Sequence, residues 1–179
     1  MGRRIEVSPD FCILWALLLL VLPLKLILAA AGAALFHELC HWAAIRLLGG
    51  QVTGLTVRAG GMVMETLPMS TGGELVCALA GPLGSFLLVF VHPNLPLLSL
   101  CALVQGCFNL MPLYPLDGGR ALCCILELAG LGWMRKYIEF AVLLLLLAGA
   151  IRMGSAAVVL WGILAFRKRP CKDGAFGVQ

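Results

Sequence analysis

Long apolar runs separated by short breaks dominate this sequence and limit the folds open to it. The runs are residues 11–22, 26–48, 73–91, 97–110, 137–151 and 155–166. A helix needs about 20 apolar residues to cross a bilayer, and fewer where the membrane is locally thin. Only 12% of the residues are charged, whereas a soluble domain carries about 25%. We therefore expect an all-α polytopic membrane protein with about six transmembrane segments.

Residues 51–66 depart from this helical pattern. Apolar and other side chains alternate there on both sides of the Gly60-Gly61 pair. Alternation with a period of two around a glycine turn is typical of a β-hairpin. We expect a short membrane-associated hairpin after the second apolar run, and a short helix near residues 119–128.

The positions of the basic residues indicate the orientation in the membrane. With the N-terminus inside, all thirteen Lys and Arg residues except Lys25 and Arg152 fall on or near the cytoplasmic side. This predicts a cytoplasmic N-terminus at residues 1–10, a transmembrane domain at 11–166 and a basic cytoplasmic tail at 167–179. The rival interpretation is a cleavable signal peptide, but Pro23 and Lys25 interrupt its apolar region. Basic runs are too short to predict a nucleic-acid partner.

The second apolar run contains the sequence His37-Glu38-Leu39-Cys40-His41, an H-E-x-x-H motif. Helical residues four apart share a face with Cβ atoms about 6 Å apart, so two imidazoles can converge on one Zn²⁺ ion. Glu38 lies beside that face and can act as a general base. Ionisable groups inside a membrane helix are costly and usually functional. The alternative is a histidine pair that only satisfies its own hydrogen bonds.

A catalytic zinc ion needs a third protein ligand and one open position. His92 precedes Pro93 in a turn that the predicted topology places on the far side of the membrane from the cytoplasm. We therefore expect it to be a turn residue rather than a metal ligand. The acidic candidates near the membrane are Glu65, Glu74, Asp117, Glu127 and Glu139. Prolines before Asp117 interrupt a helix, and glycines after it let the chain pass close to a metal. Asp117 could also be the N-cap of the helix that follows, and the two roles are compatible. Glu139, one turn beyond Arg135, is expected to form a helix-end pair of little energetic weight.

Two motifs together carry a family resemblance. They are His37-Glu38-x-x-His41 and Asn109-x-x-Pro112-x-x-Pro115-Leu116-Asp117-Gly118-Gly119-Arg120. This pair resembles the site-2 protease family of intramembrane zinc metalloproteases. The similarity is closest to the bacterial sporulation branch of stage IV sporulation protein FB, which processes a membrane-associated pro-sigma factor. Weaker matches at residues 5–9, 60–62 and 80–82 extend the resemblance over roughly residues 5–130.

The resemblance implies a zinc-dependent endopeptidase of the bacterial cell membrane. Its metal ligands would be His37, His41 and Asp117, its general base Glu38, and Asn109 would help hold the substrate or the developing oxyanion. The implied partners are membrane lipid, a membrane-tethered protein substrate such as a pro-sigma factor, and an inhibitory membrane protein. The hairpin near 52–66 would present an edge to an extended substrate.

The sequence departs from the family pattern at two places, and two other functions remain as alternatives. Ser85 stands where the family often has Asn, and only residues 167–179 follow Phe166, so the nucleotide-sensing CBS domain of the sporulation branch is not expected. A catalytically inactive zinc-binding regulator is the first alternative, and the intact Glu38 argues against it. A small metal or proton transporter is the second, but the sequence has no internal repeat with paired broken helices.

Overall fold

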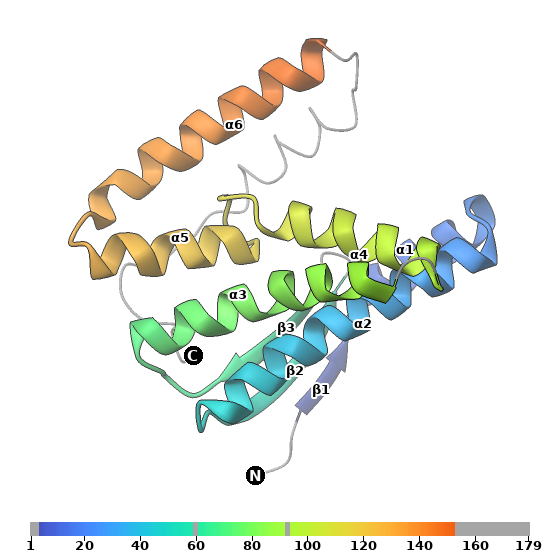
Figure 1. Ribbon diagram of the computed structural model, residues 1–179, viewed down its shortest axis with the longest axis horizontal. Helices are drawn as coiled ribbons and strands as arrows, with labels where there is room; N and C mark the ends of the chain where they lie inside the picture. The colour runs from blue at the N-terminus through green and yellow to red at the C-terminus, as the bar shows by residue number, and fades with distance from the viewer. Residues whose placement is uncertain (1–3, 59–60, 92–93, 153–179) are drawn as a thin grey trace.

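A computed structural model describes residues 4–58, 61–91 and 94–152 (Figure 1). Within these residues the chain is mostly helical and carries one small sheet. The helices are α1 (Pro9–Val21), α2 (Leu24–Leu47), α3 (Thr71–Leu87), α4 (Pro96–Asn109), α5 (Asp117–Leu128) and α6 (Arg135–Arg152). The strands are β1 (Arg4–Val7), β2 (Val52–Arg58) and β3 (Gly61–Thr66), and short 3-10 turns lie at η1 (Leu88–Val91) and η2 (Gly132–Met134).

The helix ends follow from local sequence chemistry. Pro9 and Pro96 begin α1 and α4, at positions where a missing backbone N–H costs nothing. Ser70 caps α3, because its hydroxyl accepts a hydrogen bond from the backbone N–H of Gly73 at 3.2 Å. Gly49 follows the C-terminus of α2 with a φ of 77°, a conformation that glycine adopts without strain. The predicted short helix near 119–128 is confirmed as α5.

The sheet has the order β1-β2-β3, with one more strand than we expected. The predicted hairpin is confirmed by antiparallel pairing of β2 with β3, in which Val57 lies opposite Met62. β1 pairs with β2 in parallel, with Ile5 opposite Leu55. Parallel pairing between distant segments depends on the tertiary fold, so a four-residue strand leaves little local signal. The second edge of β3 has no described strand beside it.

Helix α3 is the centre of the helical packing. It contacts α2, α4 and α5, and Figure 1 shows it between α2 and α5. Small residues allow this close approach. A Cβ atom at Gly84 of α3 would overlap the Cys40 side chain of α2, and one at Gly106 of α4 would lie 3.1 Å from the Ser85 Cβ atom. Small residues at helix contacts are typical of membrane bundles, in which lipid already solvates the large apolar side chains.

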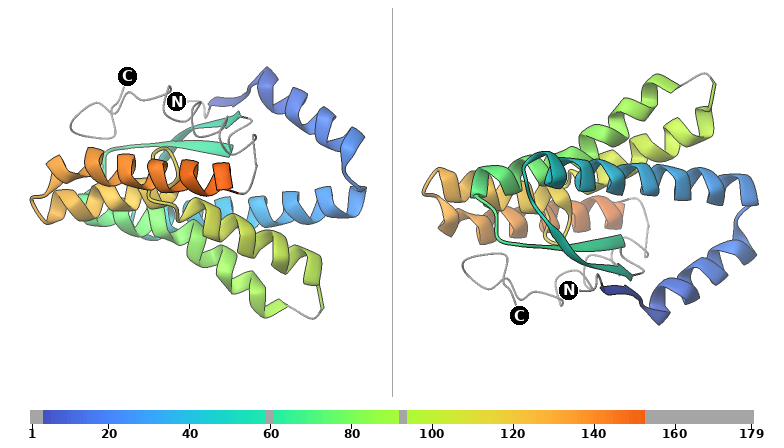
Figure 2. Two further views of the ribbon diagram at one scale, coloured as in Figure 1. Left: turned by 90° about the horizontal axis from the view of Figure 1, so that it is seen from above. Right: turned by 90° about the horizontal axis from the view of Figure 1, so that it is seen from below.

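Burial follows a similar pattern, because many large apolar side chains are exposed and most buried residues are small or polar, apart from a few Ile and Leu residues. Leu20, Leu47 and Phe90 are 83%, 87% and 84% exposed, whereas Ala33 and Ser85 are fully buried. So extensive an apolar exterior suits contact with lipid rather than water. Figure 2 shows α1 meeting α2 at one end and diverging from it towards the sheet at the other. The expected membrane character therefore has support from the fold.

The number of membrane spans is a separate matter. Two described helical segments, Leu24–Leu47 and Thr71–Phe90, are long and apolar enough to cross a bilayer. Helices α1 and α4 are apolar but have only 13 and 14 residues. The fifth predicted run lies in α6, and the sixth, at 155–166, lies outside the described residues. Six transmembrane segments are thus not confirmed.

Candidate metal centre

His37 and His41 lie on the buried face of α2, where α3 crosses it. The two imidazoles are four residues apart, with ring centroids 4.8 Å from each other, and both side chains are buried. Gly81 of α3 lies opposite them. A Cβ atom there would overlap the His41 ring and lie 2.7 Å from His37 Nε2. Only glycine leaves enough room for α3 to pass over the two rings.

Asp117 completes a triangle with the two histidines. Its Oδ2 atom lies 3.0 Å from His37 Nε2 and 3.1 Å from His41 Nε2, and the two nitrogens are 3.1 Å apart. Asp117 is the first residue of α5, and Leu116 occupies the N-cap position. The carboxylate faces the imidazoles. The predicted N-cap role of Asp117, which is compatible with metal binding, is wrong because Leu116 is the N-cap residue. The second carboxylate oxygen of Asp117, Oδ1, lies 3.8 Å from the Arg120 guanidinium.

The hydrogen bonds of the two Nδ1 atoms, which face away from the triangle, determine whether the Nε2 lone pairs point into it. His41 Nδ1 is 2.6 Å from the backbone carbonyl of Cys77, which can only accept, so Nδ1 carries the hydrogen. In the neutral ring, Nε2 then presents its lone pair to the triangle. His37 Nδ1 is 2.8 Å from the fully buried hydroxyl of Ser85. Metal-binding histidines commonly engage an oxygen through the other ring nitrogen in this way.

The geometry of the triangle fits a metal ion. Three acceptor atoms this close repel one another unless a proton or a cation lies among them. Tetrahedral zinc with ligands at about 2.1 Å separates those ligands by about 3.4 Å. The three distances of 3.0–3.1 Å are close to that value. Two imidazoles and one carboxylate therefore form a metal-binding triad, as the sequence predicted.

The two residues predicted to be catalytic lie beside this triad. The half-buried Glu38 carboxylate accepts a hydrogen bond from the backbone N–H of Met62 in β3. Asn109 ends α4, and its Nδ2 atom is 3.4 Å from His37 Nε2. The position of these groups agrees with the prediction, and their roles stay predictions. Met62 was not predicted to take part, because only the folded hairpin brings its N–H to α2.

Among the described residues, no other His, Cys, Asp or Glu cluster can hold a metal ion. This excludes the remaining acidic candidates, which are Glu65, Glu74, Glu127 and Glu139. His92 lies outside the described residues.

Ser85 has a role that sequence reasoning left open. It hydrogen-bonds the ring of a metal ligand from α3. The available signal was its spacing, because Ser85 follows Gly81 by four residues and so shares the helix face that passes the histidines.

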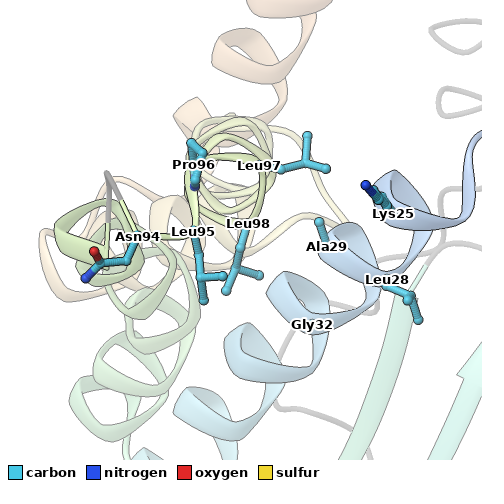
Figure 3. Close-up of a pocket in the computed structure, with 9 residues that line it drawn as sticks. All are labelled: Lys25, Leu28, Ala29, Gly32, Asn94, Leu95, Pro96, Leu97 and Leu98. Atoms are coloured by element: carbon cyan, nitrogen blue, oxygen red, sulfur yellow. The ribbon is translucent and has the colours of Figure 1, made fainter.

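A separate cavity lies towards the N-terminal end of α2, away from the triad (Figure 3). Its walls come from the first turns of α2 and α4 and include Ala29, Gly32, Leu95 and Leu98, with Lys25 at one side. None of the triad residues lines this cavity. The metal centre is instead a tightly packed contact between three helices.

Comparison with solved structures identifies the architecture. The site-2 protease from Methanocaldococcus jannaschii matches 99% of this chain and 96% of its own chain, with a TM-score of 0.67 and 23% sequence identity. The chain has the site-2 protease fold.

A curated relative supports the same resemblance at the sequence level. A zinc metalloprotease of the same organism is 35% identical over 131 residues, which cover 64% of this chain. The chain spans 36% of the length of that relative. No family model matches the chain. The names of these two similar proteins do not refer to sporulation. Membership of the sporulation branch therefore stays a prediction.

Proposed function

We propose that this chain is a zinc-dependent intramembrane endopeptidase of the site-2 protease family. The observation that carries the proposal is the buried triangle of His37 Nε2, His41 Nε2 and Asp117 Oδ2, with sides of 3.0–3.1 Å. The zinc metalloprotease relative supports the choice of metal and of reaction. Two nitrogen ligands and one oxygen ligand suit zinc.

Three protein ligands favour a catalytic over a structural site, because structural zinc sites usually have four. When bound, zinc supplies the Lewis acidity that polarises a peptide carbonyl and makes water more acidic. His37 and His41 hold the ion through Nε2, and their outer nitrogens are held in turn by Ser85 and Cys77. These outer contacts keep the ligand rings oriented.

Glu38 and Asn109 supply the remaining chemistry in this proposal. Glu38 takes a proton from the attacking water and returns it to the leaving amine. The Met62 N–H orients the Glu38 carboxylate for that transfer. Asn109 directs its Nδ2 hydrogen atoms at the centre and stabilises the oxygen of the scissile carbonyl as it gains negative charge.

The substrate class is a membrane-tethered protein. A helical segment hides its carbonyls in backbone hydrogen bonds and must unwind before attack. Strand addition along the edge of β3 that no described strand occupies would replace those bonds. Because Met62 lies on β3 and hydrogen-bonds Glu38, a peptide paired with that edge would pass close to the general base.

The membrane arrangement in the proposal keeps the sequence prediction of about six segments with both termini in the cytoplasm. The two histidines of the triad are six and ten residues from Leu47, the last residue of α2, or about 9–15 Å at 1.5 Å per residue. Water would reach it from the cytoplasmic side, past the loop between α4 and α5. A pro-sigma factor as substrate, and an inhibitory membrane partner, rest on the sequence resemblance alone.

The test compares zinc content and cleavage of a membrane-tethered substrate by the purified chain in detergent. Glu38→Gln should keep its zinc and lose cleavage. Glu127→Gln makes the same chemical change at an exposed position of α5 and should still cleave. Continued cleavage by Glu38→Gln would overturn the assigned base. A parental chain that binds zinc but cuts no substrate would favour the inactive regulator.

A further inference from the structure

A partly buried ion pair lies at the start of α6, outside the metal triad. Arg135 Nε donates to Glu139 Oε1 at 3.1 Å, one helical turn further on. Glu139 is only 2% exposed. The predicted helix-end pair is therefore confirmed, and its energetic weight stays a prediction. Loss of Arg135 would leave the buried Glu139 carboxylate without this partner.

The same arginine contacts the loop that links α4 to α5. The Arg135 guanidinium lies over the Tyr114 ring, 5.4 Å from the ring centroid. This distance suits a cation–π interaction. The loop begins directly after Asn109 and ends directly before Asp117. Arg135 thus contacts the segment whose two ends carry groups of the metal centre.

The loop packs against the first turn of α5 without free space. A Cβ atom at Gly118 would lie 2.6 Å from the Met111 carbonyl oxygen, and one at Gly119 would lie 2.6 Å from the Leu113 carbonyl oxygen. Leu113 itself is buried. Backbone in such close contact moves together, so a shift of the loop displaces Asp117 as well.

We propose that Glu139, Arg135 and Tyr114 are positioning residues of the metal centre. Glu139 orients the guanidinium, the guanidinium holds the Tyr114 ring, and the ring holds the loop that places Asn109 and Asp117. Any effect of these three residues on catalysis rests on the proposed function. Its prediction for metal geometry can be measured without any substrate.

The test measures metal binding by chelator competition and the visible absorption of the Co²⁺-substituted protein, which reports ligand geometry. Arg135→Gln and Tyr114→Leu should each weaken metal binding about 10-fold, the lower end of effects of groups around metal ligands. Both should also change the cobalt absorption band. Tyr114→Phe keeps the aromatic face and should stay within about twofold of the parental chain.

Arg152→Gln is the matched control, because Arg152 is an exposed arginine at the other end of α6. It should leave metal binding and the cobalt spectrum unchanged. Folded Arg135→Gln with parental metal affinity and spectrum would overturn the inference. If that variant does not fold, the comparison at position 114 decides, since equal losses for Tyr114→Leu and Tyr114→Phe would exclude the aromatic contact.

These outcomes are separable from those for the proposed function. A parental chain that binds metal and cuts no substrate contradicts the protease while the positioning effect on cobalt geometry still stands. A protease whose cobalt spectrum is unaffected by both Arg135→Gln and Tyr114→Leu contradicts only the positioning.

Discussion

Substitution of Gly81 by alanine tests how closely α3 must approach the metal ligands. The added Cβ atom would lie 2.7 Å from His37 Nε2, about 0.7 Å short of the 3.4 Å at which ordinary contact begins, and would overlap the His41 ring. Either α3 or the two rings must shift by several tenths of an ångström. Metal sites tolerate ligand displacements of about 0.2 Å.

The expected loss of zinc affinity is therefore at least 100-fold, which is about 2.7 kcal/mol. Overpacking of a tight contact also destabilises a fold by about 1–3 kcal/mol. Thermal unfolding of the metal-free chain measures this second effect alone. Chelator competition then measures the loss of metal binding in the variant that remains folded.

Gly72→Ala is the control, because it makes the same change in the first turn of the same helix. Gly72 is exposed, and a Cβ atom there would meet no other atom within 4 Å. It should keep parental zinc affinity, with unfolding unchanged or slightly later, since alanine favours helix by about 1 kcal/mol over glycine. Parental zinc affinity in Gly81→Ala would refute the close approach of α3 to the rings.

Three further predictions concern the ligands and their partners. Asp117→Asn should lower zinc affinity about 100-fold or more, whereas His92→Ala should leave it unchanged; the opposite ranking in a chelator titration would contradict the assigned triad. Ser85→Ala should weaken zinc binding about 10-fold because His37 loses its outer partner. Ser99→Ala removes another buried hydroxyl, which donates to the Leu88 carbonyl at 2.8 Å, and should lower only the unfolding temperature. Zinc at 100 times its Kd should stabilise the metal-free parental chain by about 2.7 kcal/mol in thermal unfolding, and an equal gain in Asp117→Asn would speak against the site.

Features set by neighbours in the chain were predictable from sequence. The spacing of His37 and His41 places both on one helix face whatever the rest of the fold does. The glycine pair at 60–61 marks the hairpin turn, and prolines with glycines mark the start of α5. These patterns depend on backbone preferences that act within a few residues.

Features that depend on distant neighbours were not predictable in this way. Asp117 lies 80 residues from His37 in the chain, and only the resemblance to a known family selected it among five acidic candidates. The burial of Glu139 follows from how α6 packs, which leaves no periodic signal at a single position. The hydrogen bond from Met62 to Glu38 likewise arises only when the hairpin folds over α2.

The Nδ1 atoms of the two histidines have different kinds of hydrogen-bond partner. Substitutions can therefore alter the partner of one histidine more easily than that of the other. His41 is held by the backbone carbonyl of residue 77, which every amino acid possesses, so side-chain substitution there leaves the acceptor in place. His37 is held by a side chain, Ser85, so a substitution at position 85 can change or remove this hydrogen-bond partner. Sequence variation at position 85 can therefore adjust the basicity of one ligand while the other stays constant. A single substitution at position 85 can thus change the affinity for the metal without altering the ligands themselves.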